Sequence, residues 1–329
     1  MQSKSIIDIH CHTAGIGAGG SGCFVSPALM GSWKYRIYLR AFGVTEKELV
    51  QEGDGLILRR ISEKLEQSQR VTAAVILAMD GVIGDDGELD REKTEIYIPN
   101  EFIAAETRRY PHLLFGASIN PLRRDAIERL EQAAAGGAVL IKWLPSIQHI
   151  DPADERLPPF YLKLKELGLP LLTHTGAESS FTLTRDDLGD PERLRLPLSL
   201  GVTVIAAHAA SNGKNHGESN YDRFLRLCRA FPNLYADISA LTQVNRLGQL
   251  QRVIRSSELH GRLLYGTDMP LLNTGLVTPF AFPTSLSPRQ MRAISKIANP
   301  WDQDVALKEA LGVSEDIFHK AGSIIRRSE

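Results

Sequence analysis

The sequence contains few cysteines, and their spacing indicates neither a disulfide framework nor a cysteine metal site. Only three cysteines occur among 329 residues. They are Cys11, Cys23 and Cys228, an odd number without any CxxC pair. We therefore interpret each of them as a small buried apolar residue.

The chain also lacks an excess of charge and any long apolar segment. Its 38 lysines and arginines balance 39 acidic residues, and the net charge is −1. Without a run of like charges, neither nucleic-acid binding nor an anionic membrane surface is indicated. No apolar run is long enough to cross a membrane, and the residues before Asp8 are too few and too polar for a signal peptide. We expect a cytoplasmic protein whose partner is a small molecule, with a homodimer as one compatible assembly.

Short β-branched runs alternate with amphipathic stretches along the whole chain, and hydrophobic residues make up 43% of it. This alternation is typical of parallel β/α units. The expected strands span residues 5–12, 71–80, 112–118, 138–143, 169–174, 202–208, 233–238 and 262–268. The expected helices span residues 54–69, 99–110, 122–135, 155–167, 190–200, 218–231 and 245–257, with an eighth that begins near Pro288.

Eight strands and eight helices in succession predict an α/β fold, a TIM (β/α)8 barrel formed by residues 1–329 as a single domain. Two segments are longer than the barrel requires, residues 13–53 after the first strand and residues 269–287 after the eighth. Loops that follow strands surround the active site in this fold, so both are candidate lids, and residues 13–53 are the expected lid insertion. The alternative is that they only cover the barrel mouth. The stretch from Pro300 is expected to add helices outside the barrel.

The first strand closes on the sequence Asp-Ile-His-Cys-His at positions 8–12. Because side chains alternate between the faces of a strand, His10 and His12 point the same way and can converge on one metal ion inside a barrel. Taken alone, the pair is also compatible with ordinary core or surface histidines.

Ionisable residues end three later strands as well. His174, His208 and Asp268 are each the last or nearly the last residue of an apolar run. Burying such groups without partners is costly, so their recurrence at one end of the sheet favours a shared divalent cation.

Lys142 ends the fourth strand. A protonated lysine cannot ligate a metal, so its functional interpretations are a lowered pKa or carbamylation by CO2, which gives a carboxylate that bridges two metals. The alternative is a cation that pairs with a neighbouring carboxylate or holds a carboxylate of the substrate.

In this order, the HxH pair, Lys142, His174, His208 and Asp268 resemble the amidohydrolase superfamily. Residues 137–176 and the sequence Gly-Thr-Asp-Met-Pro at 266–270 resemble its amidohydrolase-related branch. That branch includes metal-dependent hydrolases and decarboxylases similar to aminocarboxymuconate-semialdehyde decarboxylase. The resemblance covers nearly the whole chain, and its specificity comes from the ordered set.

The resemblance implies a divalent metal, with zinc as the expected element and one or two ions. The implied ligands are His10, His12, Lys142 when carbamylated, His174, His208 and Asp268. Asp268 would also act as general base toward the attacking water, and His208 would ligate a second metal or polarise the substrate. The implied activity is hydrolysis of an ester, lactone or amide in a small acidic substrate, with non-oxidative decarboxylation or hydration as the alternative. A barrel used only for binding is the third hypothesis.

Substrate contacts are expected from Arg36 and Arg40, which follow the first strand and could clamp a carboxylate with their guanidinium groups, and from Trp143. Helix-surface positions are the alternative for the two arginines. Asp80 and Asp237 end the second and seventh strands. Each could support a ligand histidine or make a cap or loop hydrogen bond.

Overall fold

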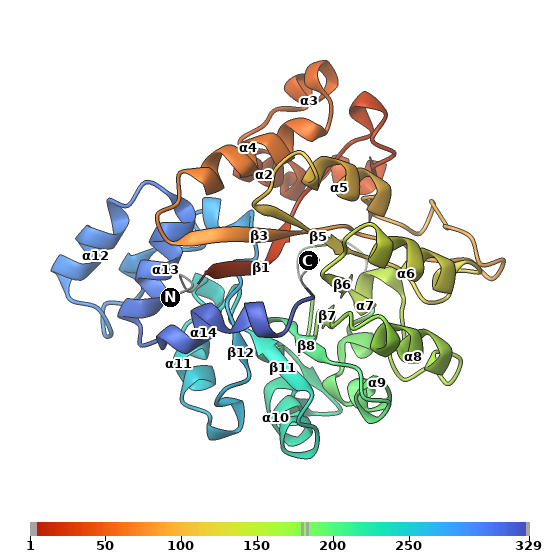
Figure 1. Ribbon diagram of the computed structural model, residues 1–329. Coiled ribbons are helices and arrows are strands. Elements are labelled where there is room, and N and C mark those ends of the chain that lie inside the picture. Colours follow the sequence, from red (N-terminus) through yellow and green to blue (C-terminus); the bar gives the residue numbers. More distant parts are fainter. Residues whose placement is uncertain (1–4, 179–180, 182–183, 327–329) are drawn as a thin grey trace.

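An eight-stranded parallel sheet forms the centre of the computed structural model, which describes residues 5–178, 181 and 184–326 (Figure 1). In spatial order the strands are β1 (Ile6–His12), β3 (Val71–Leu77), β5 (Leu113–Ala117), β6 (Leu140–Trp143), β7 (Leu171–Thr173), β8 (Val204–Ala206), β11 (Leu234–Asp237) and β12 (Leu263–Leu264). The chain after β12 returns to β1, where the Asp268 amide donates to the His10 carbonyl over 2.9 Å and Cys11 bridges Met269. The predicted barrel fold is therefore confirmed.

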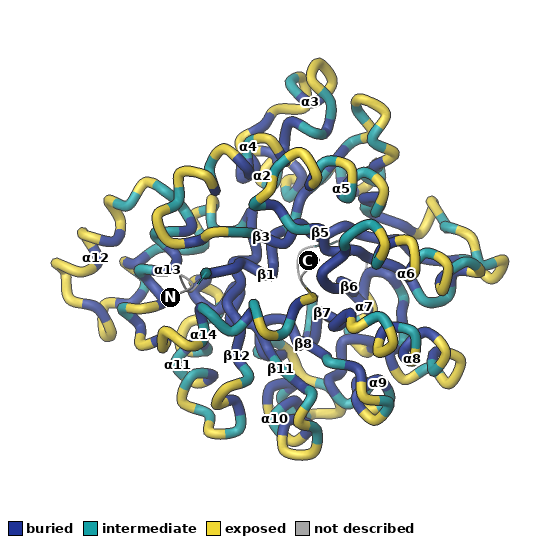
Figure 2. Tube along the Cα trace, in the orientation of Figure 1, coloured by how far each residue is buried: buried dark blue, intermediate teal, exposed yellow. Residues whose placement is uncertain are grey.

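Helices surround this sheet, and Figure 2 shows buried strands inside helices whose outer sides are exposed. The helices that follow the barrel strands are α4 (Gly55–Glu66), α5 (Asn100–Thr107), α6 (Ala126–Ala135), α8 (Pro158–Glu166), α9 (Arg195–Ser199), α10 (Asn220–Ala230), α11 (Gln249–Ile254) and α12 (Pro288–Ser295). All eight begin and end within the predicted ranges or close to them. At α12, Ser287 and Gln290 form a capping box and proline occupies the first turn, which fixes where the helix begins.

The apolar core has two layers, and β1 is irregular between them. Ile7 and Ile9 pack inside the barrel, whereas Cys11 packs between the sheet and the helices. The pairing of β1 with β3 shifts register between Asp8 and Cys11. Such an irregularity changes which residues share a face. It brings His10 and His12 to the interior side that Ile7 and Ile9 occupy further down the strand.

The predicted insertion at residues 13–53 is an ordered substructure. It contains β2 (Phe24–Val25), α1 (Pro27–Met30), α2 (Trp33–Phe42) and α3 (Glu46–Glu52), and β2 pairs with β4 (Ile96–Tyr97). A capping box formed by Thr45 and Glu48 begins α3. The remaining short elements are α7 (Pro145–Gln148) and the hairpin of β9 (Lys214–Asn215) and β10 (Glu218–Ser219).

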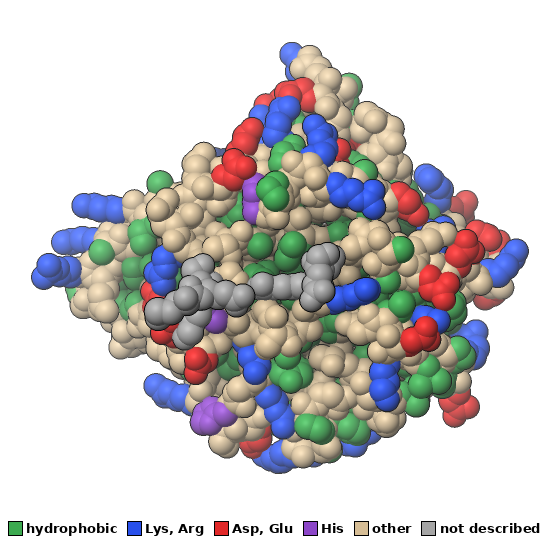
Figure 3. Space-filling model, viewed as in Figure 1, with side chains coloured by type: hydrophobic (Ala, Val, Ile, Leu, Met, Phe, Trp, Pro, Cys, Tyr) green, Lys and Arg blue, Asp and Glu red, His purple; other side chains and the backbone are tan. Residues whose placement is uncertain are grey.

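The C-terminal stretch forms α13 (Pro300–Ala310) and α14 (Glu315–His319), which pack against the outside of the barrel, where α14 contacts β1 and β12. Trp301 of α13 is fully buried, and its indole Nε1 donates to Asp8 Oδ2 over 2.9 Å. Basic and acidic side chains both occur around the edge of the face shown in Figure 3. Within the described residues, no helix is long and apolar enough to span a membrane.

Candidate metal centre

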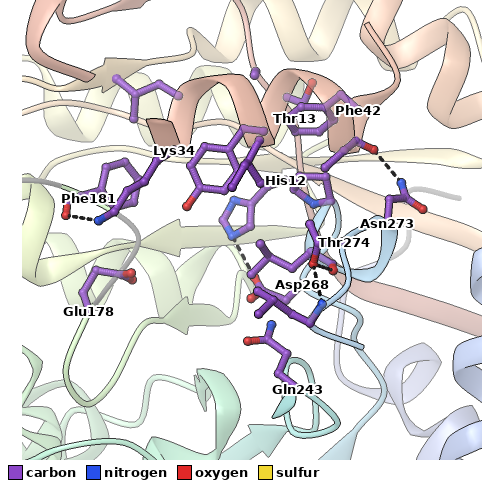
Figure 4. Close-up of a pocket in the computed structure, with 18 of the residues that line it drawn as sticks. His12, Thr13, Lys34, Phe42, Glu178, Phe181, Gln243, Asp268, Asn273 and Thr274 are labelled. Carbon is purple, nitrogen blue, oxygen red and sulfur yellow. Dashed lines mark hydrogen bonds and ion pairs between the residues drawn. The ribbon is translucent and has the colours of Figure 1, made fainter. Parts of the chain in front are cut away.

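A cavity of about 750 Å³ opens at the carboxyl ends of the barrel strands. Its walls are formed by α2 and by the loops that follow β7, β11 and β12 (Figure 4). The predicted site residues that line it are His12, Lys142, His174, His208 and Asp268. His10 lies next to them and is fully buried. The strand ends therefore bring together all six residues for which the sequence predicted a metal-related role.

Three of these side chains face one another across a short gap. His10 Nε2 lies 3.1 Å from His12 Nε2, and Asp268 Oδ1 lies 3.5 Å from the former and 3.4 Å from the latter. Figure 4 shows His12 and Asp268 pointing toward each other at the cavity wall. Two imidazole nitrogens and a carboxylate oxygen are common ligands of divalent transition metals. The donor set therefore fits such an ion.

Asp237 fixes the orientation of the His10 ring. Its Oδ2 lies 2.8 Å from His10 Nδ1, so that nitrogen donates a proton and Nε2 keeps its lone pair toward the gap. Burial, together with the charge of Lys142, lowers the pKa of His10 to about 4. The ring is therefore neutral, as metal ligation requires. The structure shows both sequence interpretations of Asp237, because it orients His10 and also accepts from the amides of His208 and Ser239 in the segments that follow β8 and β11.

His208 is held by Ser239, whose Oγ lies 2.8 Å and whose carbonyl oxygen lies 3.0 Å from His208 Nδ1. The His208 ring stacks on His10 at a centroid distance of 5.1 Å. Asp237 also accepts the His208 amide proton. Hydrogen bonds already join His10, His208, Asp237 and Ser239. We therefore interpret these four residues as support for the set of His10, His12 and Asp268 that faces the gap. Burial holds the pKa of His208 well below its usual value, so this ring is neutral as well.

His174 contributes an orphaned polar atom. Its Nδ1 lies 3.4 Å from Glu178 Oε2, whereas its Nε2 is buried and has no hydrogen-bond partner in the described part of the chain. Burial lowers the pKa of His174 too. A buried imidazole nitrogen without a partner is unusual, and a bound cation would satisfy it.

Lys142 reaches the same gap from β6. Its Nζ lies 2.9 Å from His10 Nε2, and burial lowers its pKa to about 8. The carboxylates of Asp237 and Asp268 act in the opposite direction and favour the charged form. The contact places Lys142 beside the very nitrogen that would ligate a metal.

The backbone of two site residues adopts a left-handed conformation that L-amino acids rarely occupy. Asp268 has φ of 65° and His208 has φ of 55°. Such residues cost on the order of 1–3 kcal/mol each and cluster at functional sites. Hydrogen bonds hold the first of them, because Asp8 accepts from the Thr267 amide over 3.0 Å and from the Thr267 hydroxyl over 2.6 Å. Asp8 therefore couples the position of Asp268 to that of β1.

The three predicted substrate contacts lie in different surroundings. Arg40 lines the cavity, while Arg36 is exposed on α2 and lies outside the lining. Trp143 follows Lys142 on β6 and therefore points to the opposite face, where it packs on Phe160 with its Nε1 donating to the Ile119 carbonyl. This position gives no support to a substrate contact by Trp143, because strand residues alternate between faces.

Sequence reasoning missed a cation and an amide that face the cavity from the loop after β11. Arg246 Nε and Gln243 Nε2 are buried, line the cavity and have no hydrogen-bond partner within the described residues. A terminal nitrogen of Arg246 donates to Ser211 Oγ over 2.9 Å, which positions the guanidinium group. Nothing in the local sequence separates this arginine from the many on helix surfaces.

Asp80 belongs to a separate network at the mouth. Its carboxylate accepts from Arg123 Nε over 2.6 Å and from the Asn120 amide over 2.8 Å. Both Asp80 and Arg123 are buried. Of the two sequence interpretations of Asp80, the structure therefore shows the loop hydrogen bond.

A family model described as amidohydrolase matches residues 7–292. An uncharacterised TIM-barrel protein from Bordetella bronchiseptica is similar in structure, with 18% identity, a TM-score of 0.56, and coverage of 97% of this chain and 99% of that one. A probable 2-pyrone-4,6-dicarboxylic acid hydrolase from Acinetobacter baumannii, solved with citric acid bound, has 11% identity and a TM-score of 0.53, over 96% and 95% of the two chains.

The 5-carboxyvanillate decarboxylase of Sphingomonas paucimobilis is also similar, with 11% identity, a TM-score of 0.51, and coverage of 99% of this chain and 100% of that one. At these identities the likeness to solved structures shows the fold alone. None of the curated proteins matches this chain in sequence.

Proposed function

Because the chain belongs to the amidohydrolase family, we propose that it is a metal-dependent enzyme that hydrolyses an ester, lactone or amide bond in an acidic substrate. The single observation that carries the proposal is the converging set of His10 Nε2, His12 Nε2 and Asp268 Oδ1 at the base of the cavity. Within the family, we place the protein in the branch similar to aminocarboxymuconate-semialdehyde decarboxylase. We propose zinc as the metal and the cytoplasm as the location.

His10, His12 and Asp268 would hold the ion, with His174 as a further ligand through its orphaned Nε2. A divalent cation bound there supplies Lewis acidity, which lowers the pKa of water and polarises a carbonyl oxygen. Asp237 keeps the His10 ring in the tautomer that ligation needs. Hydrogen bonds and stacking hold His208 next to this centre, where it would polarise the substrate.

Asp268 carries the negative charge that a metal ligand and a proton acceptor both need. Although burial alone would raise its pKa, the neighbouring His208, His12 and His10 hold that pKa well below its usual value. The carboxylate is therefore ionised at neutral pH and able to accept a proton from the attacking water and to return it to the leaving group. Its left-handed backbone fixes the direction in which it points.

Arg246 and Gln243 account for an acidic substrate. Their unsatisfied donors face the cavity, and a carboxylate would accept from both. Arg40 offers a second cation nearer the mouth. We further propose that residues 13–53 act as a lid, because α2 forms one wall of the cavity.

Lys142 has two roles consistent with its position. Carbamylated, it would add a carboxylate ligand and allow a second metal; unmodified, it would be a cation that orients a substrate carboxylate. Intact-mass measurement in the presence and absence of bicarbonate separates the two, because only a carbamylated lysine gains the mass of CO2.

Decarboxylation on the same scaffold is the second candidate, and the apolar lining of the cavity favours it. Met79, Leu144 and Leu276 line the wall near the strand ends. A carboxylate in such surroundings loses hydration, which favours its departure as neutral CO2.

The test combines metal analysis with product analysis. We expect at least one divalent ion per chain in purified protein and, on a panel of carboxylate-bearing lactones, esters and amides, products that have gained the mass of water. Release of CO2 without water addition would assign decarboxylation instead. Less than about 0.1 ion per chain, with no activation by added Zn²⁺ or Mn²⁺, would refute both. The Asp268→Asn protein, checked for folding by circular dichroism, is the inactive control.

A further inference from the structure

One wall of the cavity is an apolar helix face that the metal chemistry does not require. Helix α2 buries Tyr35, Leu39 and Phe42 in the core. Trp33, Ile37 and Ala41 recur at intervals of four residues on another side and line the cavity. A soluble helix usually has one apolar stripe. The second stripe on α2 therefore requires its own explanation.

Two residues of the stripe are exposed, whereas Ala41 is buried. The side chain of Trp33 is 69% exposed and that of Ile37 is 41% exposed, both at the rim of the cavity. A tryptophan with this exposure beside a further exposed apolar residue is characteristic of a binding surface. Figure 4 shows the neighbouring residues Lys34 and Phe42 of α2 on either side of His12 in this view.

The adjoining wall continues the apolar surface. Leu271 and Leu276, in the loop after β12, line the same cavity. This loop is tied to α2, because Asn273 Nδ2 donates to the Ala41 carbonyl over 2.8 Å. It is also tied to the loop after β11, because the Val244 amide donates to the Leu276 carbonyl over 2.9 Å. The two walls and the loop that carries Arg246 are therefore one connected assembly.

The polar end of this channel is defined by Arg246 Nε and Gln243 Nε2, two of the buried atoms that have no partner within the described residues. A channel with a cation at one end, an apolar wall along its length and a metal-ligand set at its base fits a ligand with the same distribution. Its volume of about 750 Å³ is larger than a short polar acid would fill.

We propose that the substrate is an amphipathic carboxylate, whose anionic group meets Arg246 and whose hydrocarbon portion lies along the stripe of Trp33, Ile37 and Ala41. This inference rests on the proposed function, since it places the reacting bond at the metal centre. The proposed function concerns only the acidic group of the substrate, whereas this inference also assigns a site to its apolar portion.

Trp33 provides a readout of binding that does not depend on turnover. Trp143 and Trp301 are fully buried, so a ligand in the channel changes the emission of Trp33. Straight-chain carboxylates from butanoate to decanoate, titrated into the Asp268→Asn protein, serve as probes. We expect the emission to move to shorter wavelength and the dissociation constant to fall about two- to fourfold for each added methylene, as burial of a CH₂ group predicts.

Two comparisons locate the ends of the ligand. Octanoate should bind at least about tenfold more tightly than octanol, and Arg246→Gln should remove that difference, because it removes the cation. Ile37→Asn should flatten the dependence on chain length. The matched control is Leu162→Asn on α8, where the residue is 52% exposed and does not line the cavity. This control should leave unchanged both the preference for octanoate over octanol and the dependence of the dissociation constant on chain length.

A dissociation constant that is the same for all chain lengths would overturn the inference. So would an emission of Trp33 that already lies at short wavelength and moves with protein concentration, because a second copy of the chain would then cover α2. The titration is repeated with the wild-type protein, on which metal content and turnover are also measured. If metal and turnover are present but the dissociation constant does not depend on chain length, this inference alone is refuted. If the dissociation constant depends on chain length but the protein holds no metal, the proposed function is refuted and the carboxylate is only a bound ligand.

Discussion

The two halves of the barrel mouth are built from the same kinds of residue and behave differently. In the structural half, at the ends of β3, β5 and β6, a closed network of hydrogen bonds joins Asp80, Ser118, Asn120, Arg123 and Gln148. In the reactive half, the loops after β7 and β11 leave His174 Nε2, Gln243 Nε2 and Arg246 Nε buried without partners in the described chain.

The difference separates structural from functional burial of polar groups. Arg123 is buried, and its Nε and Nη2 both donate to the carboxylate of Asp80, so the edge of the guanidinium group that carries these two atoms is already occupied. Arg246 instead has its Nε buried without a partner in the described chain, so that atom can still donate to a ligand. Buried groups in proteins are nearly always satisfied, so the exceptions that line the cavity are candidate contacts for a ligand.

The largest effect is expected in the reactive half, from Asp268→Asn. Loss of a metal ligand and general base should lower kcat/KM by at least about 10³-fold, while the free energy of unfolding changes little. Steady-state kinetics and elemental analysis of the same sample check this. Retained turnover with full metal content would remove Asp268 from both of its roles.

The next effect is expected in the structural half, from Arg123→Leu. The change leaves the carboxylate of Asp80 buried without its cation, so the free energy of unfolding should fall by about 3–5 kcal/mol, measured by urea denaturation. Arg124→Leu is the matched control, because Arg124 is the neighbouring arginine and is exposed. If Arg123→Leu reduced metal content without loss of stability, the division between the two halves would be wrong.

Two buried aspartates at strand ends give a direct test of the division. Asp237→Asn should weaken metal affinity about 10- to 100-fold, because Asp237 orients the His10 ring. Asp80→Asn should leave metal affinity unchanged and lower stability instead. Titration against a chelator of known affinity measures the first quantity and urea denaturation the second. Equal losses of metal affinity in both variants would contradict the comparison.

The smallest effect is expected from Trp301→Phe, which removes one of the hydrogen bonds to Asp8. Asp8 keeps its bonds to the His10 amide and to Thr267. We therefore expect a loss of about 1–3 kcal/mol in the free energy of unfolding, and unchanged metal content. A loss of metal in this variant would show that α13 is needed to shape the centre.

Much of this architecture could be predicted from the sequence. The order of apolar runs gave the eight strands, because a parallel strand covered on both faces must be apolar throughout. Capping residues such as Ser287 marked where helices begin. Ionisable residues at strand ends identified the mouth, since burial of such groups is costly enough to be rare without a purpose.

Other features depended on contacts between distant parts of the chain. The spacing of His10 and His12 predicted a shared face, but the register shift in β1 decided that this face is the barrel interior. Arg36 and Arg246 are alike as sequence. Only the fold exposes the first on α2 and places the second in the cavity wall with its Nε buried.

The sequence by itself determined the barrel and the set of side chains at its mouth, because periodicity and the cost of burial act locally along each strand. The tertiary structure decided which of those side chains satisfy one another. Asp80 follows β3 and Asp237 ends β11, yet one meets Arg123 and the other meets His10. Hydrogen-bond partners come from residues far apart in the chain, and only their positions in space determine which polar atoms remain available to a metal or a substrate.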